Sequence, residues 1–149
     1  MVAGIEGPRI GLHVCRGNWS RNEDVLLSGD YTALIPTLEA MQVDQLVLEF
    51  ATPRAGEIGL VGNALSQREI GLGVVNPRTA EVEPVEQIVA RVERALEFWR
   101  PEQIFLNPDC GFGCFAERCV NGQDVALGKL RAMVAAARLL RERHGGAAR

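Results

Sequence analysis

Residues 70–99, IGLGVVNPRTAEVEPVEQIVARVERALEFW, contain one complete strand–loop–helix unit. The apolar run Ile70–Val75 stops at Asn76-Pro77, as a buried strand does. Pro84 then begins a segment whose apolar residues recur at helical spacing, and proline is tolerated in the first turn of a helix. That apolar stripe comprises Val85, Ile88, Val89, Val92, Leu96 and Trp99. The stretch therefore predicts a strand followed by a helix that packs one face onto it.

The same unit recurs along the whole chain. The predicted strands are residues 9–15, 45–50, 70–75 and 104–106, and the other predicted helices are residues 31–41, 61–67 and 123–143. In the last helix we expect an inward face made of Leu127, Leu130, Val134, Ala137 and Leu140. Gly71 and Gly73 lie inside a strand, where glycine indicates close packing. Strand followed by helix, four times over, predicts parallel strands joined by crossover helices.

The spacing of the units indicates a particular α/β architecture. The predicted strands end at Cys15, Glu49, Asn76 and Cys110, so the steps are 34, 27 and 34 residues. A (β/α)8 TIM barrel of about 250 residues averages roughly 31 residues per unit. We therefore expect one domain over residues 1–149 that contains four consecutive β-α units, half of a barrel. A small open sheet is the alternative, and it needs helices on both faces.

Composition excludes several functional classes. The chain has 149 residues, 47% of them hydrophobic, and a net charge of −3. Such a charge does not favour a nucleic-acid partner, and no run approaches the roughly 18 apolar residues of a membrane span. The N-terminus lacks the pattern of a signal peptide, which favours a cytoplasmic, reducing location. The four cysteines are then expected to be thiols or metal ligands.

Four side chains with metal-binding chemistry fall at the carboxyl ends of the predicted strands. His13 and Cys15 are two residues apart, so they point to one face of a strand, while Glu49 and Cys110 end other strands. Two thiolates, an imidazole and a carboxylate suit zinc rather than magnesium or calcium. Each residue taken alone also has a structural interpretation. Cys15 could be a small buried apolar side chain, and His13 could be a hydrogen-bonded histidine of the core. Glu49 follows an apolar run, where a buried carboxylate needs a partner.

Motifs around these residues resemble the C-terminal catalytic domain of cobalamin-independent methionine synthases. The matching segments, in order, are Gly11-Leu12-His13-Val14-Cys15, Leu48-Glu49, Ile70-Gly71-Leu72-Gly73-Val74 and Asn107-Pro108-Asp109-Cys110-Gly111. The resemblance extends from about residue 9 to 143. It implies the second, zinc-carrying half of a TIM barrel, with His13, Cys15, Glu49 and Cys110 as the zinc ligands.

The resemblance also implies a reaction. A zinc-dependent methyltransferase of this type activates the thiol of homocysteine, and that thiol takes a methyl group from a donor, in methionine biosynthesis. The folate-using relatives carry a histidine after the third strand, where this chain has Arg78. Arg78 is suited to orienting an anionic substrate but is a poor proton donor. A related thiol alkyltransferase, similar to epoxide–coenzyme M transferases, is the alternative enzyme.

Half a barrel implies a partner. Amino-acid recognition in this family needs the other strands, so we expect a homo-oligomer or a partner chain that completes the barrel. A non-catalytic zinc-binding subunit is the alternative outside enzymes. Cys114 and Cys119 follow Cys110 at a spacing that matches no standard zinc signature, so we interpret them as incidental or substitute thiols.

Overall fold

The computed structural model describes residues 4–18, 20–113 and 119–145, and within them four parallel strands form one sheet. The strands are β1 (Gly11–Val14), β2 (Gln45–Glu49), β3 (Glu69–Val75) and β4 (Ile104–Pro108). The α-helices are α1 (Ile35–Ala40), α2 (Ile58–Leu65), α3 (Val85–Ala95) and α4 (Gln123–His144). The four predicted strand–helix units are confirmed. The helix expected over residues 31–41 is divided into a 3₁₀ turn, η2 (Thr32–Leu34), and α1.

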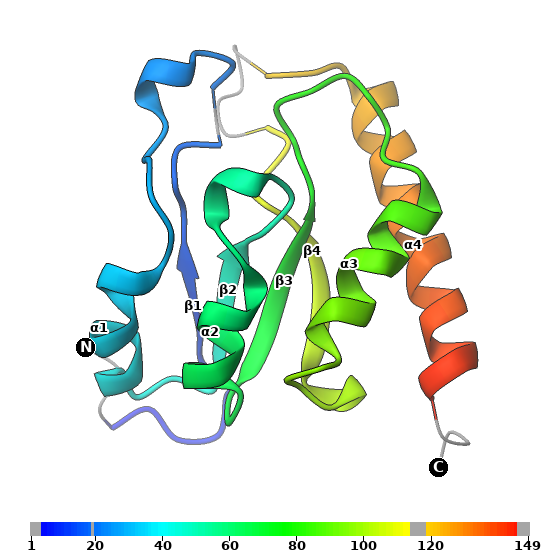
Figure 1. Ribbon diagram of the computed structural model, residues 1–149. Helices are drawn as coiled ribbons and strands as arrows, with labels where there is room; N and C mark the ends of the chain where they lie inside the picture. Colours follow the sequence, from blue (N-terminus) through cyan, green and yellow to red (C-terminus); the bar gives the residue numbers. More distant parts are fainter. Residues whose placement is uncertain (1–3, 19, 114–118, 146–149) are drawn as a thin grey trace.

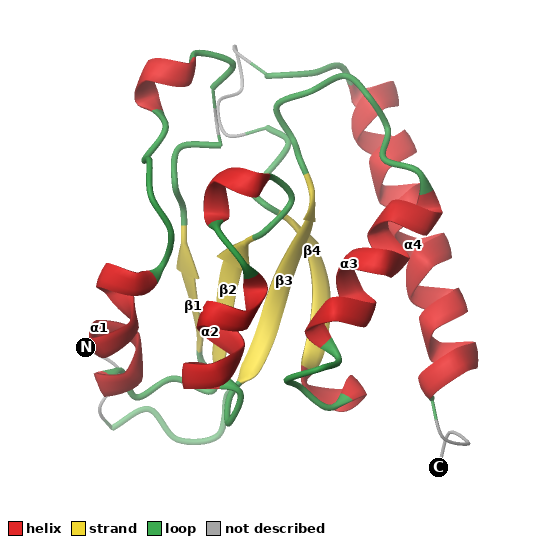
Figure 2. Cartoon of the chain, in the orientation of Figure 1, coloured by secondary structure: helices red, strands yellow, loops and turns green. Residues whose placement is uncertain are grey.

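The order of the strands decides between the two architectures that the sequence left open. The sheet runs β1-β2-β3-β4, so each new strand is added on the same side of the last. Right-handed crossovers with that order place every connecting helix on one face of the sheet. Figure 1 shows α1, α2 and α3 in front of the strands with α4 beside α3, and Figure 2 shows the same layering by colour. This is the winding of half a TIM barrel and not of an open sheet covered on both faces.

The core lies between the sheet and these helices. The strand residues that point toward the helices are almost fully buried; they include Leu46, Leu48, Ile70, Leu72 and Val74. Of the apolar stripe predicted after Pro84, Ile88, Val89 and Val92 are buried on α3, and Trp99 is buried just past its end. The opposite face of the sheet, which is the interior of a barrel, is more open. His13 is exposed there, and the Phe105 side chain is 38% exposed.

Two glycines of β3 allow that inner face to be crowded with side chains from neighbouring strands. A Cβ at Gly71 would lie 2.8 Å from a methyl group of Val47 and 2.9 Å from Oδ1 of Asn107. A Cβ at Gly73 would lie 2.2 Å from Oδ1 of Asp109. The interpretation of these glycines as sites of close packing is confirmed, and Gly73 makes room for a carboxylate.

The inward face predicted for α4 is wrong in most of its positions. Leu140 is buried, but Leu127, Leu130 and Val134 are between 37% and 47% exposed. The side chains that α4 does bury are Lys129, Ala132, Ala136 and Leu140. Periodicity locates an apolar stripe, but it does not say which neighbour covers that stripe. Here Ala132, Ala136 and Leu140 face the interior, and Leu127, Leu130 and Val134 face outward.

An apolar groove of about 570 Å³ lies between α4 and the edge strand β4. Its walls include Phe105 and Leu106 of β4 together with Met133 and Val134 of α4. Parallel edge strands are normally covered, so this groove and β4 mark one end of an incomplete barrel wall. None of the helices in the described ranges has the length and apolar character needed to cross a bilayer.

Candidate metal centre

The four predicted ligands meet at the carboxyl end of the sheet. His13 lies on β1, Cys15 directly follows it, Glu49 is the last residue of β2, and Cys110 follows β4. One ligand atom from each of the four lies within 4.8 Å of those of the others. Residues up to 97 positions apart in sequence therefore form one cluster, because parallel strands bring their carboxyl ends to the same edge.

The spacing of the two sulfur atoms fits a tetrahedral zinc site. Two thiolates bound to one zinc at about 2.3 Å lie about 3.8 Å apart. The Sγ atoms of Cys15 and Cys110 are separated by 3.8 Å, far beyond the roughly 2.05 Å of a disulfide. The set of two thiols, one imidazole and one carboxylate matches the ligands that zinc takes in proteins.

A backbone carbonyl orients His13. Its Nδ1 lies 3.0 Å from the carbonyl oxygen of Val47 on the neighbouring strand. A carbonyl oxygen only accepts hydrogen bonds, so Nδ1 is the nitrogen that donates in this contact, and Nε2 is the nitrogen not engaged by it. Metal-bound histidines are usually held in this way, with the second nitrogen donating to an acceptor that fixes the ring. The arrangement leaves Nε2 as the donor atom for a metal.

Glu49 is a buried carboxylate with partners on both oxygens. Its side chain is 1% exposed; Oε1 accepts from the backbone N–H of Arg16 at 2.9 Å, and Oε2 accepts from Nδ2 of Asn18 at 2.5 Å. Burial raises the pKa of Glu49, while the Arg16 hydrogen bond and the charge on His13 act to lower that pKa. A cation bound next to it would favour the ionised form further.

Asp109 hydrogen-bonds the backbone that follows Glu49. Its Oδ1 accepts from the backbone N–H groups of Phe50 and Ala51, both at 2.9 Å, and Asn18 donates to its Oδ2 at 3.3 Å. Its side chain is fully buried, and this desolvation raises the pKa of Asp109 to about 7, with the nearby charge of Glu49 acting in the same direction. Asp109 thus fixes the backbone just after Glu49, and Asn18 bridges the two carboxyl groups.

A buried tyrosine, Tyr31, also hydrogen-bonds the backbone at the end of β2. The hydroxyl of Tyr31 accepts from the backbone N–H of Glu49 at 2.8 Å and donates to its carbonyl at 3.2 Å. Burial raises the pKa of Tyr31, so the phenol stays protonated. The guanidinium of Arg16 lies 5.0 Å from the centre of the Tyr31 ring. Sequence reasoning missed Asn18 and Tyr31 as supports of the cluster, because neither carries a spacing signal.

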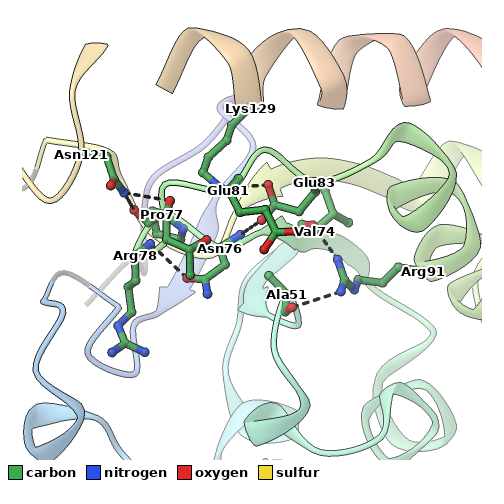
Figure 3. A network of polar contacts seen from close by, with 11 residues as sticks. Ala51, Val74, Asn76, Pro77, Arg78, Glu81, Glu83, Arg91, Asn121 and Lys129 are labelled. Atoms are coloured by element: carbon green, nitrogen blue, oxygen red, sulfur yellow. Dashed lines mark hydrogen bonds and ion pairs between the residues drawn. The ribbon is translucent and has the colours of Figure 1, made fainter. Parts of the chain in front are cut away.

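The loop between β3 and α3 is tied down by polar contacts, which Figure 3 shows at close range. Glu83 accepts from the backbone N–H of Asn76 at 2.7 Å and from Nζ of Lys129 at 3.0 Å. Asn121 donates to the carbonyls of Pro77 and Thr79 at 2.7 and 3.0 Å. Lys129 is fully buried, so its ion pair with Glu83 fixes α4 to the loop between β3 and α3.

Arg78 lies on that loop, apart from the four clustered ligands. Its Nε donates to the carbonyl of Ser20 at 2.5 Å, and a terminal nitrogen donates to that of Arg21 at 3.1 Å. It therefore connects the loop after β3 to the loop after β1. Cys119 is exposed and belongs to no ligand cluster among the described residues, while Cys114 lies outside them.

The fold and the site together define the class of protein. The sheet is wound as half of a TIM barrel, and a cluster of ligands with two sulfur atoms lies at the carboxyl ends of its strands. This is a half-barrel domain with a candidate zinc centre. The family model described as "Cobalamin-independent synthase, Catalytic domain" matches residues 7–139. The chain belongs to this family.

Known proteins similar to this chain agree with that assignment. It is 33% identical to the methionine synthase of Pyrococcus horikoshii over 134 residues, which are 90% of this chain and 34% of the relative. Identity to the methionine synthase of Sulfolobus acidocaldarius is 30%, with the same coverage. The chain thus spans about a third of the curated relatives that it matches.

Solved structures show the same fold. A B12-independent methionine synthase from Shewanella sp. W3-18-1, in complex with selenomethionine, superimposes with a TM-score of 0.79 at 19% identity. The match covers 95% of this chain and 41% of that one. A putative vitamin-B12 independent methionine synthase from Listeria monocytogenes gives a TM-score of 0.60 at 24% identity, over 93% and 36% of the two chains. The fold is therefore part of the barrel found in these proteins.

Proposed function

We propose that this chain is the zinc-binding half of a methionine-synthase-type barrel that transfers a methyl group to the thiol of homocysteine. His13, Cys15, Glu49 and Cys110 hold the zinc in this proposal. The observation that carries it is the cluster itself, with four ligand atoms within 4.8 Å and two sulfur atoms 3.8 Å apart. Family membership and the names of the relatives support the reaction type.

The chemistry that bound zinc supplies is a lowered pKa for a coordinating substrate thiol, whose ordinary value is about 8.5. The residues of the chain prepare the position for it. The carbonyl of Val47 orients the ring of His13, while Asn18 and the backbone of Arg16 hold Glu49. The thiolate ligands must stay reduced, which supports a cytoplasmic location for the protein.

We propose that four further strands complete the barrel, supplied by a second copy or by another polypeptide segment. The exposure of His13 and Phe105 on the inner face of the sheet and the groove between β4 and α4 support this. The 149-residue chain purified by itself tests it through its mass in solution. A dimer supports completion by a second copy, and a monomer that acquires methyl-transfer activity only with another segment supports a separate partner.

Zinc content tests the metal centre. We expect about one zinc per purified chain, and loss of the metal in both Cys15→Ser and Cys110→Ser. Cys119→Ser is the matched control, because Cys119 is also exposed and lies outside the cluster. Folded wild-type protein without zinc, or equal zinc in all three variants, would overturn the proposed site.

Alkylation of a free thiol separates catalysis from zinc binding alone. Methyl iodide serves as a small methyl donor that needs no binding site of its own. We expect the zinc-loaded chain to accelerate methylation of homocysteine at neutral pH, and Cys110→Ser to abolish the acceleration. Faster reaction of 2-mercaptoethanesulfonate (coenzyme M) would favour the related thiol alkyltransferase. Zinc binding without any acceleration would favour a non-catalytic half-barrel subunit.

A further inference from the structure

The two outer edges of the half barrel have complementary surfaces. Among the described residues, β1 pairs only with β2, and β4 pairs only with β3. We call these edges the β1 edge, which consists of β1 and residues 22–40, and the β4 edge, which consists of β4 and α4. Figure 1 shows them at opposite ends of the layer. The backbone groups of an edge strand favour pairing with the edge of another sheet.

The β4 edge is apolar toward the carboxyl end of the sheet and basic toward the amino end. An exposed stripe at helical spacing runs along α4 and consists of Leu127, Leu130, Val134, Arg138 and Arg141. Val134 and Arg141 also line the groove between α4 and β4. The whole helix contains five basic and two acidic side chains, which gives it a formal net charge of +3.

The β1 edge has the same order of surfaces with the opposite charge. Val25 and Leu27 are exposed toward the carboxyl end, where the backbone of Leu27 is hydrogen-bonded to the loop after β1 (Figure 1). Leu34 is exposed just before α1, and Glu39 is exposed in the last turn of α1, toward the amino end. Residues 22–44 contain five carboxylates and no basic side chain.

Two copies of the chain are enough to close a ring. Four consecutive strands with their helices on one face form half of an eight-stranded barrel, and closure of a barrel removes every sheet edge. A second copy, turned by half a turn about the barrel axis, brings its β1 edge to the β4 edge of the first copy. Apolar surfaces then meet at the carboxyl end, and Glu39 meets Arg138 and Arg141 at the amino end.

We propose that this chain forms a twofold homodimer in which the β4 edge of each copy packs against the β1 edge of the other. The matching order of apolar and oppositely charged surfaces on the two edges of one chain favours a second copy as the occupant. The dimer rests on the proposed function, for which it names the partner that completes the barrel. It places two candidate metal centres at the same end of one barrel.

Sedimentation equilibrium of the purified chain tests the dimer. We expect the wild type to have the mass of two chains. Val134→Glu puts a charge into the apolar stripe at a position that is 47% exposed in the single chain, so the fold should persist. Each dimer contains this contact twice, so we expect the dissociation constant to rise about hundredfold. Leu60→Glu, the same change at a 40% exposed position on α2, is the matched control and should dimerise as the wild type does.

Exchange of charges identifies the two edges that meet. Arg138→Glu and Glu39→Arg, made separately, each place like charges opposite one another and should weaken the dimer about tenfold. The two changes combined in one chain restore opposite charges at both contacts, so the dissociation constant should return to within about threefold of the wild-type value. Damage to the fold of the single chain would not be repaired by a second reversal of charge.

The proposal is wrong if the folded wild-type chain is a monomer or forms larger assemblies. It is also wrong if Val134→Glu dimerises as Leu60→Glu does, or if the charge variants show neither the weakening nor its reversal. Zinc content of the same samples separates the dimer from the metal centre, and Val134→Glu should keep its zinc. A dimer without zinc would refute the proposed function alone, while a zinc-containing monomer would refute the dimer alone.

Discussion

Replacing Gly73 by alanine should damage both stability and the metal centre. The added Cβ would lie 2.2 Å from Oδ1 of Asp109 and 2.8 Å from the carbonyl oxygen of Leu48. The backbone of β2 is fixed by its neighbours, so the carboxyl group of Asp109 is the part that must move. That movement breaks its hydrogen bonds to the N–H groups that follow Glu49.

The size of the effect follows from those contacts. Each of the two hydrogen bonds contributes about 0.5–1.5 kcal/mol, because the raised pKa of Asp109 makes them close to ordinary neutral hydrogen bonds, and an overpacked core costs about 1–3 kcal/mol by itself. We therefore expect Gly73→Ala to lower the free energy of unfolding by about 3 kcal/mol. Glu49 loses its support at the same time, so zinc affinity should fall as well.

Urea unfolding monitored by circular dichroism, combined with zinc analysis, measures both effects. Gly11→Ala is the matched control, since it also adds one methyl group to a strand, but its nearest neighbour would be 3.6 Å away. That variant should be neutral or more stable by up to about 1 kcal/mol. Gly73→Ala with wild-type stability and full zinc content would refute the argument that Asp109 requires this glycine.

Three further outcomes are expected. Lys129→Ala should cost about 3 kcal/mol of unfolding free energy, since it leaves the partly buried carboxylate of Glu83 without its cation. The double variant with Glu83→Gln should recover part of that loss. Tyr31→Phe should cost about 1–2 kcal/mol, because it removes the hydroxyl that pairs with the backbone of Glu49. The raised pKa of Asp109, about 7, predicts that its contribution to the stability of the metal-free chain is full below about pH 4 and is lost as the pH rises through 7. Asp109→Asn should flatten that dependence in urea titrations across this range, and a stability that instead rises between pH 4 and 7 in the wild type alone would contradict the prediction.

The sequence determined the elements of the fold because hydrophobic periodicity is local. The strand Ile70–Val75 and the helix that follows Pro84 were both predicted from their own residues, and the structure contains them. The residues of the candidate centre were also visible, because each predicted ligand lies at or directly after a strand end. Topology then explains why they meet, since the carboxyl ends of parallel strands share one edge.

Only the tertiary structure decided which neighbours surround each element. The strand order placed all helices on one face, and it gave α4 a partner on its alanine face while leaving Val134 outward. Asn18 and Tyr31 hydrogen-bond Glu49, and Asp109 hydrogen-bonds the residues after it, over long sequence distances for which no periodic pattern exists. Local sequence determines secondary structure because its forces act between near neighbours. Contacts between distant residues depend on how the finished elements pack.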